Sequence, residues 1–264
     1  MNEGRSLARP ARARSSGAWL VAALLGLAAL AWALTVEGAR AMGNSPGTMG
    51  RGPGGFVLLW TTMMAAMMLP AVAPVATIYL RAIATRSSGV TRGLRTGGLV
   101  VGYLGMWAAT GILAFAAAWG GSRLARQAPG VAPWVAAAVL AAAGLYQLTP
   151  FKDRCLRHCR SPLGQLLHVG SYSGRLRDVR AGLYHGGYCL GCCWALMAVL
   201  IPVGVMNLAW MVGLSLVVFF EKTWRRGRVL GIAFGLGLLA FACLVPWHPG
   251  LVPGLHAGVG MRMG

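Results

Sequence analysis

Long apolar stretches follow one another along this chain, and they constrain its fold more than any other feature. Windows of about 19 residues identify seven of them, at 17–36, 56–80, 97–119, 131–148, 184–205, 207–221 and 229–246. A helix of about 20 apolar residues is long enough to cross a bilayer. We therefore expect an all-α, polytopic helical membrane bundle of about seven transmembrane helices.

The scarcity of charge agrees with this expectation. Only 11% of the 264 residues are charged and 57% are hydrophobic, whereas about a quarter of a soluble domain is charged. The composition therefore excludes a water-soluble globule, a disordered chain and a soluble enzyme of the dinucleotide-binding or barrel type. The lipid bilayer is the first partner that we expect.

The few charges are strongly basic, with 24 Lys and Arg against 5 Asp and Glu. They stand in short clusters between the apolar stretches, a pattern that sets orientation in membrane proteins. Most of them face the cytoplasm if the N-terminus is cytoplasmic and the C-terminus is extracytoplasmic. The basic charge is thus explained without nucleic acid, and no nucleic-acid partner is expected.

This topology divides the chain into a basic cytoplasmic tail (1–16), a single transmembrane domain (17–246) with an inner loop at 149–183, and an extracytoplasmic tail (247–264). The fifth and sixth spans share a very short turn near Met206 and Asn207. The first span precedes Ala39-Arg40-Ala41, which is similar to a signal-peptide cleavage site. Its apolar run is longer than the usual signal core of about 7–15 residues, so we favour a retained anchor.

Five of the six cysteines form two groups, which the topology places at the cytoplasmic face. Cys155 and Cys159 follow the fourth span, and Cys189, Cys192 and Cys193 stand where the fifth begins. Cytosolic thiols are kept reduced, so clustered cysteines there indicate metal binding or catalysis before disulfides. The sixth, Cys243, lies alone in the last span and is assigned to packing.

The spacing within each group suits a metal ion. If the fifth span is helical, residues 185, 189 and 192 or 193 share one face, and Cys155 and Cys159 show the same four-residue step. Facing pairs would supply four sulfurs, or three sulfurs and one imidazole, in a tetrahedral site for Zn or Cu. The predicted metal ligands are Cys155, Cys159, Cys189, Cys192, Cys193, His185 and His158.

Three segments carry a resemblance to a known family. They are Trp60 to Pro70 (WTTMMAAMMLP), Tyr146 to Pro162 (YQLTPFKDRCLRHCRSP) and Gly186 to Met197 (GGYCLGCCWALM). In these motifs the chain resembles an uncharacterised bacterial family of predicted metal-binding integral membrane proteins. The resemblance implies metal binding by the five clustered cysteines and a place in the bacterial cell (inner) membrane. It supplies no reaction, and His158 lies outside its pattern.

Four methionines in the second span offer a second soft-ligand set. Met63, Met64, Met67 and Met68 could form a path for a soft metal from the outer face toward the cysteines. The alternative is that they fill the apolar core.

Ionisable side chains are nearly absent from the spans. Asp153 and Glu221 stand at cytoplasmic ends beside Lys152 and Lys222, where we expect charge pairing. We find no buried carboxylate for proton coupling, no phosphate-binding loop and no Ser/His/Asp set, so an enzyme is not the favoured expectation.

Three functions remain. The first is metal handling or transport through the cysteine cluster. The second is a structural assembly protein in which the ion links the inner loop to the fifth span, since closed four-ligand sites are mostly structural. The third is a membrane thiol-redox protein. The spacing of Cys155 and Cys159 and the lack of a thioredoxin-like βαβ pattern disfavour it. No protein partner is predicted.

Overall fold

The computed structural model describes residues 8–42, 47–83, 89–161 and 172–255, and in these ranges every regular element is a helix. The expectation of an all-α fold is therefore confirmed for the described part. The α-helices are α1 (Ala8–Met42), α2 (Pro53–Ile83), α3 (Gly89–Gln127), α4 (Ala132–Gln147), α5 (Pro150–Arg160), α7 (Arg177–Ala198), α8 (Leu200–Val203), α9 (Leu208–Thr223) and α10 (Gly227–Leu244), and two short 3-10 helices, η1 (Pro249–Leu251) and η2 (Pro253–Leu255), follow.

Local sequence explains where several helices begin. Thr149 caps α5 by accepting a hydrogen bond from the Lys152 amide, and Pro150 takes the first helical position, where its missing N–H costs nothing. Asn207 caps α9 in the same way. Gly204, with φ of 101°, makes the turn between α8 and α9, at the place where the sequence predicts a short hairpin.

Among the described residues, five helical segments are long and apolar enough to cross a membrane: Gly17–Ala41, Pro53–Ile83, Gly89–Gln127, Arg177–Val203 and Gly227–Leu244. The pair α4 and α5 would add a sixth if it counts as one bent span. α9 corresponds to the predicted span 207–221 but has only 16 residues. The count of seven spans therefore stays a prediction.

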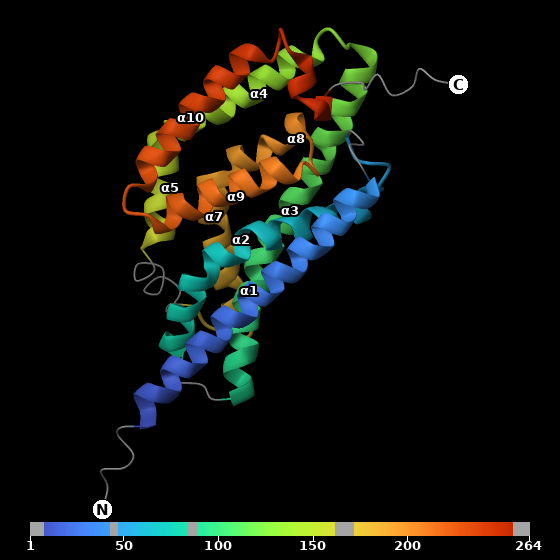
Figure 1. The fold of residues 1–264 in the computed structure, drawn as a ribbon. Coiled ribbons are helices and arrows are strands. Elements are labelled where there is room, and N and C mark those ends of the chain that lie inside the picture. Colours follow the sequence, from blue (N-terminus) through green and yellow to red (C-terminus); the bar gives the residue numbers. More distant parts are fainter. Residues whose placement is uncertain (1–7, 43–46, 84–88, 162–171, 256–264) are drawn as a thin grey trace, which may run out of the picture.

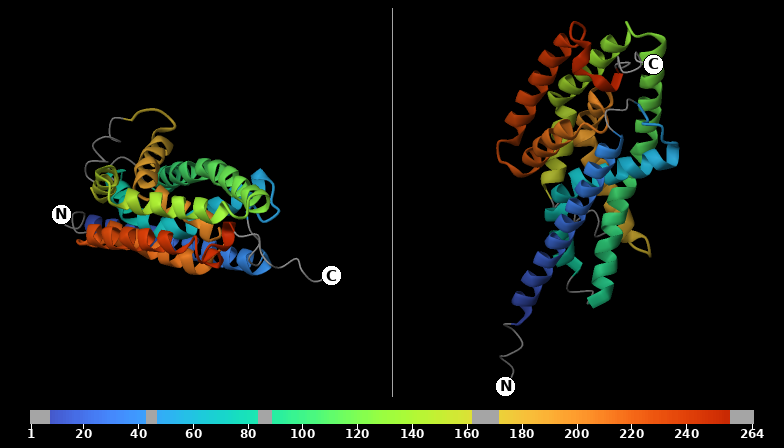
Figure 2. Two further views of the ribbon diagram at one scale, coloured as in Figure 1. Left: turned by 90° about the horizontal axis from the view of Figure 1, so that it is seen from above. Right: turned by 45° about the vertical axis from the view of Figure 1, so that its right-hand side comes forward.

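The helices pack in layers (Figure 1). α1 lies along α2, and α4 lies along α10. Seen from above in Figure 2 (left), α1, α9 and α10 occupy one side of the molecule, α2 and α4 lie behind them, and α3 is on the far side. α7 contacts α3, α4, α5 and α9, so its cysteines lie where several helices converge.

Glycines allow α3 and α7 to cross at very short range. A Cβ added to Gly102 would collide with the Val179 carbonyl, and one added to Gly182 would collide with the Leu99 carbonyl. Small residues that let backbones approach in this way are typical of helix packing in membranes. The crossing fixes α7, and with it the second cysteine group, against α3.

A bend of 61° separates α4 from α5. The predicted inner loop 149–183 therefore begins with a helix, and α7 starts at Arg177, before the predicted start of the fifth span at 184. The bend turns α5 so that it packs against α7.

Two carboxylates are buried in the bundle, which the sequence reading did not anticipate. Glu221 pairs with Lys152, which also donates a hydrogen bond to Gln147, and all three side chains are buried. Asp178 accepts hydrogen bonds from Tyr79 and Arg95.

Charge pairing at Glu221 and Asp153 is present, but the partners are not the adjacent lysines. Glu221 reaches Lys152 instead of Lys222, and Asp153 contacts Arg228 at 2.8 Å. Adjacent helical residues point in different directions, so the pairs form between helices instead.

Candidate metal centre

The two cysteine groups meet where α5 packs on α7. Cys159 Sγ of α5 and Cys192 Sγ of α7 lie 3.9 Å apart, and both side chains are buried. The residues are 33 positions apart in the chain, so the bend between α4 and α5 is what brings them together. The convergence that the metal hypothesis required is present for this pair.

Cys155 lies one helical turn from Cys159 and packs against the backbone of α7. A Cβ added to Gly191 would lie 2.8 Å from Cys155 Sγ. Gly191 directly precedes Cys192, so the first thiol is adjacent to the sulfur pair. Tyr146 donates a hydrogen bond to the Gly191 carbonyl and holds this part of α7 against α4.

Cys189 has two polar partners that the sequence reading missed. Lys222 Nζ lies 2.9 Å from Cys189 Sγ, and the Tyr103 hydroxyl lies 3.0 Å from it. Lys222 directly follows the predicted span 207–221, so its place at the predicted cytoplasmic boundary was a usable signal. Nothing in the sequence marks Tyr103.

The remaining thiols of α7 turn toward its own backbone. Cys192 Sγ and Cys193 Sγ donate hydrogen bonds to the Cys189 carbonyl, at 3.0 Å and 2.9 Å. Cys192 in addition faces Cys159 across the interface. Of the two neighbouring thiols, Cys192 is therefore the one that reaches α5.

The two predicted histidine ligands contact aromatic rings. His185 is buried and stacks on Tyr103, with 5.6 Å between the ring centroids. Its Nδ1 atom is buried without a hydrogen-bond partner among the described residues. His158 stacks on Tyr188 at 3.7 Å.

Within the described ranges, no group of three or more His, Cys, Asp or Glu side chains is arranged to hold a metal ion. The ligand role of the seven predicted residues is not tested by this finding, and the four-ligand site stays a prediction. What the geometry provides is one pair of thiols within reach of a common ion, with the Cys155 thiol and the half-buried Lys222 close to it.

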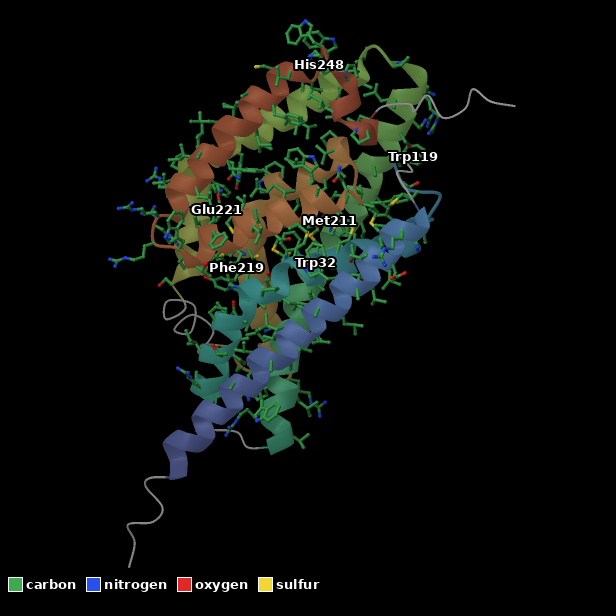
Figure 3. The ribbon with its side chains drawn as sticks, viewed as in Figure 1. Trp32, Trp119, Met211, Phe219, Glu221 and His248 are labelled. Carbon is green, nitrogen blue, oxygen red and sulfur yellow. The ribbon has the colours of Figure 1, made fainter. Side chains whose placement is uncertain are left out.

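The four methionines of α2 are buried in the core of the bundle. α2 contacts α9, and Figure 3 shows Met211 of α9 on the part of that helix nearer α3, while Glu221 lies toward α5 and α10. Burial fits both interpretations of these methionines, as core packing and as soft ligands.

Two cavities follow the exposed side of α7. The first, of about 630 Å³, is a groove lined by Cys155, Arg180, Met106, Phe151, Leu183 and three tyrosines, together with Gly187 and Gly191. The second, of about 490 Å³, is lined mainly by tryptophans and aliphatic side chains from α2, α3 and α7. Gly187 and Gly191 line both cavities, so the two adjoin at this strip of α7.

A family model described as "PpoB2: Copper chaperone" matches residues 57–245. The matched range contains all five clustered cysteines, the methionines of α2, and Lys222. No curated protein and no solved structure matches the chain significantly. This description is consistent with the resemblance to a metal-binding family, while metal binding by this chain and the membrane and bacterial parts of that resemblance stay predictions. The family model matches well over half of the chain, and the chain therefore belongs to the PpoB2 copper chaperone family.

Proposed function

We propose that this protein is an integral membrane protein that binds Cu(I) between Cys159 and Cys192 and handles it as cargo, for delivery or transport. The observation that carries the proposal is the 3.9 Å separation of the two sulfur atoms. With metal–sulfur bonds of about 2.3 Å, that separation corresponds to an S–metal–S angle of about 116°. The pair can thus close on an ion with little movement.

The donor set favours copper over zinc. Soft thiolates select Cu(I), and Cu(I) is stable with fewer sulfur ligands than the four of a structural zinc site. Lys222 places a positive charge next to Cys189 and so offsets part of the negative charge of a thiolate complex. The family description, copper chaperone, supports the same ion.

The surface supports a membrane location. Large apolar side chains such as Leu113, Trp134 and Leu236 are exposed on three different helices, as expected for residues that face lipid. Seven spans with a cytoplasmic N-terminus in a bacterial inner membrane remain our expectation. In that arrangement α4 and α9, with 16 residues each, are about 24 Å long and are the two shortest spans.

Copper binding by the detergent-purified protein tests the proposal. Cu(I) is added without oxygen in competition with a chromophoric chelator, and the bound metal is measured by element analysis. We expect stoichiometric copper in the wild type and its loss when Cys159 and Cys192 are both replaced by Ser. The exposed Cys243 of α10 supplies the matched control: Cys243→Ser should bind as the wild type does. Equal binding by the double variant would overturn the assignment.

The same samples separate the alternatives. A structural role predicts tightly held metal after purification and loss of folded protein in the double variant. A thiol-redox role predicts a cysteine pair that cycles between oxidised and reduced forms without metal. If the double variant folds but no longer binds exchangeable copper, that result supports copper handling.

The methionines of α2 are tested separately, by copper uptake into cells. If Met63, Met64, Met67 and Met68 form a path for Cu(I), replacing all four by Leu removes their soft sulfur atoms while nearly keeping the core volume. Uptake should fall severalfold, whereas copper binding by the purified variant should persist. Unchanged uptake would show that these residues are packing only.

A further inference from the structure

Cys155 occupies a different position from the other four clustered cysteines. It lines the 630 Å³ groove beside α7, and none of the other four is among the described residues of that lining. We infer that Cys155 is the loading ligand of the copper site: it receives Cu(I) in the groove and passes it to the Cys159–Cys192 pair. This inference rests on the proposed copper-binding function.

Burial separates Cys155 from the three cysteines of α7. Cys189, Cys192 and Cys193 are at most 2% exposed, and Cys155 and Cys159 are each 8% exposed. Exposure alone does not distinguish Cys155 from Cys159, but the groove does, because only Cys155 lines it. A copper complex in the groove therefore meets the Cys155 sulfur first.

Copper bound to Cys155 would have only a short distance to travel to the Cys159–Cys192 pair. Cys155 Sγ packs against Gly191, the residue before Cys192, and Cys159 lies one turn further along α5. Gly191 has no side chain, so no group stands between the Cys155 sulfur and this part of α7. A side chain here would fill the space that the sulfur occupies, which explains why this position suits glycine.

The reaction is a ligand exchange that keeps copper as Cu(I). We expect the cargo to arrive on a low-molecular-weight thiol. Its bond from copper to the carrier sulfur breaks, a bond from copper to Cys155 Sγ forms, and the Cys155 proton goes to the departing thiolate. The copper–Cys155 bond then breaks as bonds from copper to Cys159 and Cys192 form. One of the two protons that these thiols lose goes to Cys155, and the other is released through the groove. No electron donor or acceptor is needed.

The lining of the groove suits such a carrier. Arg180 is exposed on α7 and lines the groove, so an anionic Cu(I)–thiolate complex would be attracted to its guanidinium group. The remaining lining is largely apolar and aromatic, which would exclude water from the exchanging sulfur.

Loading kinetics of the full-length protein in detergent test the inference. Cu(I) is supplied as its glutathione complex, and transfer is followed by stopped-flow absorbance in the ultraviolet; affinity is measured separately by chelator competition. For Cys155→Ser we expect a loading rate lower by about tenfold or more, because the accepting sulfur atom is gone, and an affinity within about threefold of wild type. Cys243→Ser, which removes an exposed thiol of α10 outside the cysteine cluster, is the control and should load at the wild-type rate.

A second variant narrows the groove without touching any sulfur. Gly187 lines the groove, and a Cβ there would make only an ordinary contact, 3.8 Å from Met106 Cε. Gly187→Leu should therefore fold, load slowly and keep its affinity. Such a result supports the groove as the route even if Cys155→Ser fails to fold.

The outcomes are distinguishable. Wild-type loading rates in both Cys155→Ser and Gly187→Leu, with copper still bound, would overturn the loading role and leave the proposed function intact. An affinity that falls in Cys155→Ser as much as the rate would make Cys155 a ligand of the final site and overturn the loading role. A wild type that binds no copper would overturn the proposed function together with this inference.

Discussion

Replacing Glu221 by Leu is expected to lower the free energy of unfolding by about 3–5 kcal/mol, because it leaves the Lys152 ammonium buried without its counter-charge. Both side chains are only 2% exposed, so water cannot solvate the charge that remains. Lys152→Met should cost a similar amount by leaving the carboxylate alone. The measurement is unfolding in mixed micelles by titration with SDS, followed by circular dichroism.

The double variant Lys152→Met/Glu221→Leu should be more stable than either single variant. Replacing both charges by apolar groups of similar size is often close to neutral. We expect a remaining loss of about 1–3 kcal/mol, since Gln147 loses the hydrogen bond from Lys152 and keeps a buried amide oxygen unpaired.

The ion pair between Arg228 and Asp153 gives the matched control for this cycle. The Arg228 side chain is 68% exposed, so Arg228→Gln should change stability by no more than about 1 kcal/mol. Additive losses in the double variant would contradict the burial of an interacting charge pair.

A second large effect is expected at the crossing of α3 and α7. Gly182→Leu places a side chain on the Leu99 carbonyl, and neither helix backbone can yield without separating from the other. We expect a loss of at least about 3 kcal/mol or failure to accumulate folded protein. Displacement of α7 would also move Cys192 relative to Cys159, so copper affinity should fall in the protein that still folds.

Gly105→Leu is the control for this substitution. It stands on α3, one turn from Gly102, and a Cβ there meets nothing within 4 Å. The same change should therefore be neutral or stabilising by up to about 1 kcal/mol, because Leu favours a helix more than Gly does. Similar stability of Gly182→Leu and Gly105→Leu would show that the helices do not cross at this distance.

The helical class could be predicted because apolar length and the lack of charge leave few alternatives. Helix boundaries were harder to predict. The sequence predicts an inner loop at 149–183, because basic residues interrupt the apolar pattern there. Yet Thr149 and Pro150 form a good helix start, and α5 buries Cys155, Leu156 and Cys159 on one face.

The convergence of the cysteine groups could be predicted from their spacing, because each group puts thiols on one helical face. The sequence could not predict which thiols come into contact, because that depends on how the bend before α5 orients this helix. Partners from distant helices, such as Tyr103 and Lys222 at Cys189, leave no local pattern in the sequence. The same holds for Lys152 and Glu221, whose pairing joins α5 to α9.

If α5 rotated as a rigid helix about the break between α4 and α5, Cys159 would move relative to Cys192. The distance along the helix axis from Pro150 to Cys159 is about 14 Å, so a rotation of about 10° at the break moves the far thiol by about 2 Å. Added to the present separation of 3.9 Å, that shift exceeds the reach of two metal–sulfur bonds of about 2.3 Å. A rotation of α5 by this amount would therefore place the sulfurs of Cys159 and Cys192 too far apart for one copper ion to bridge them.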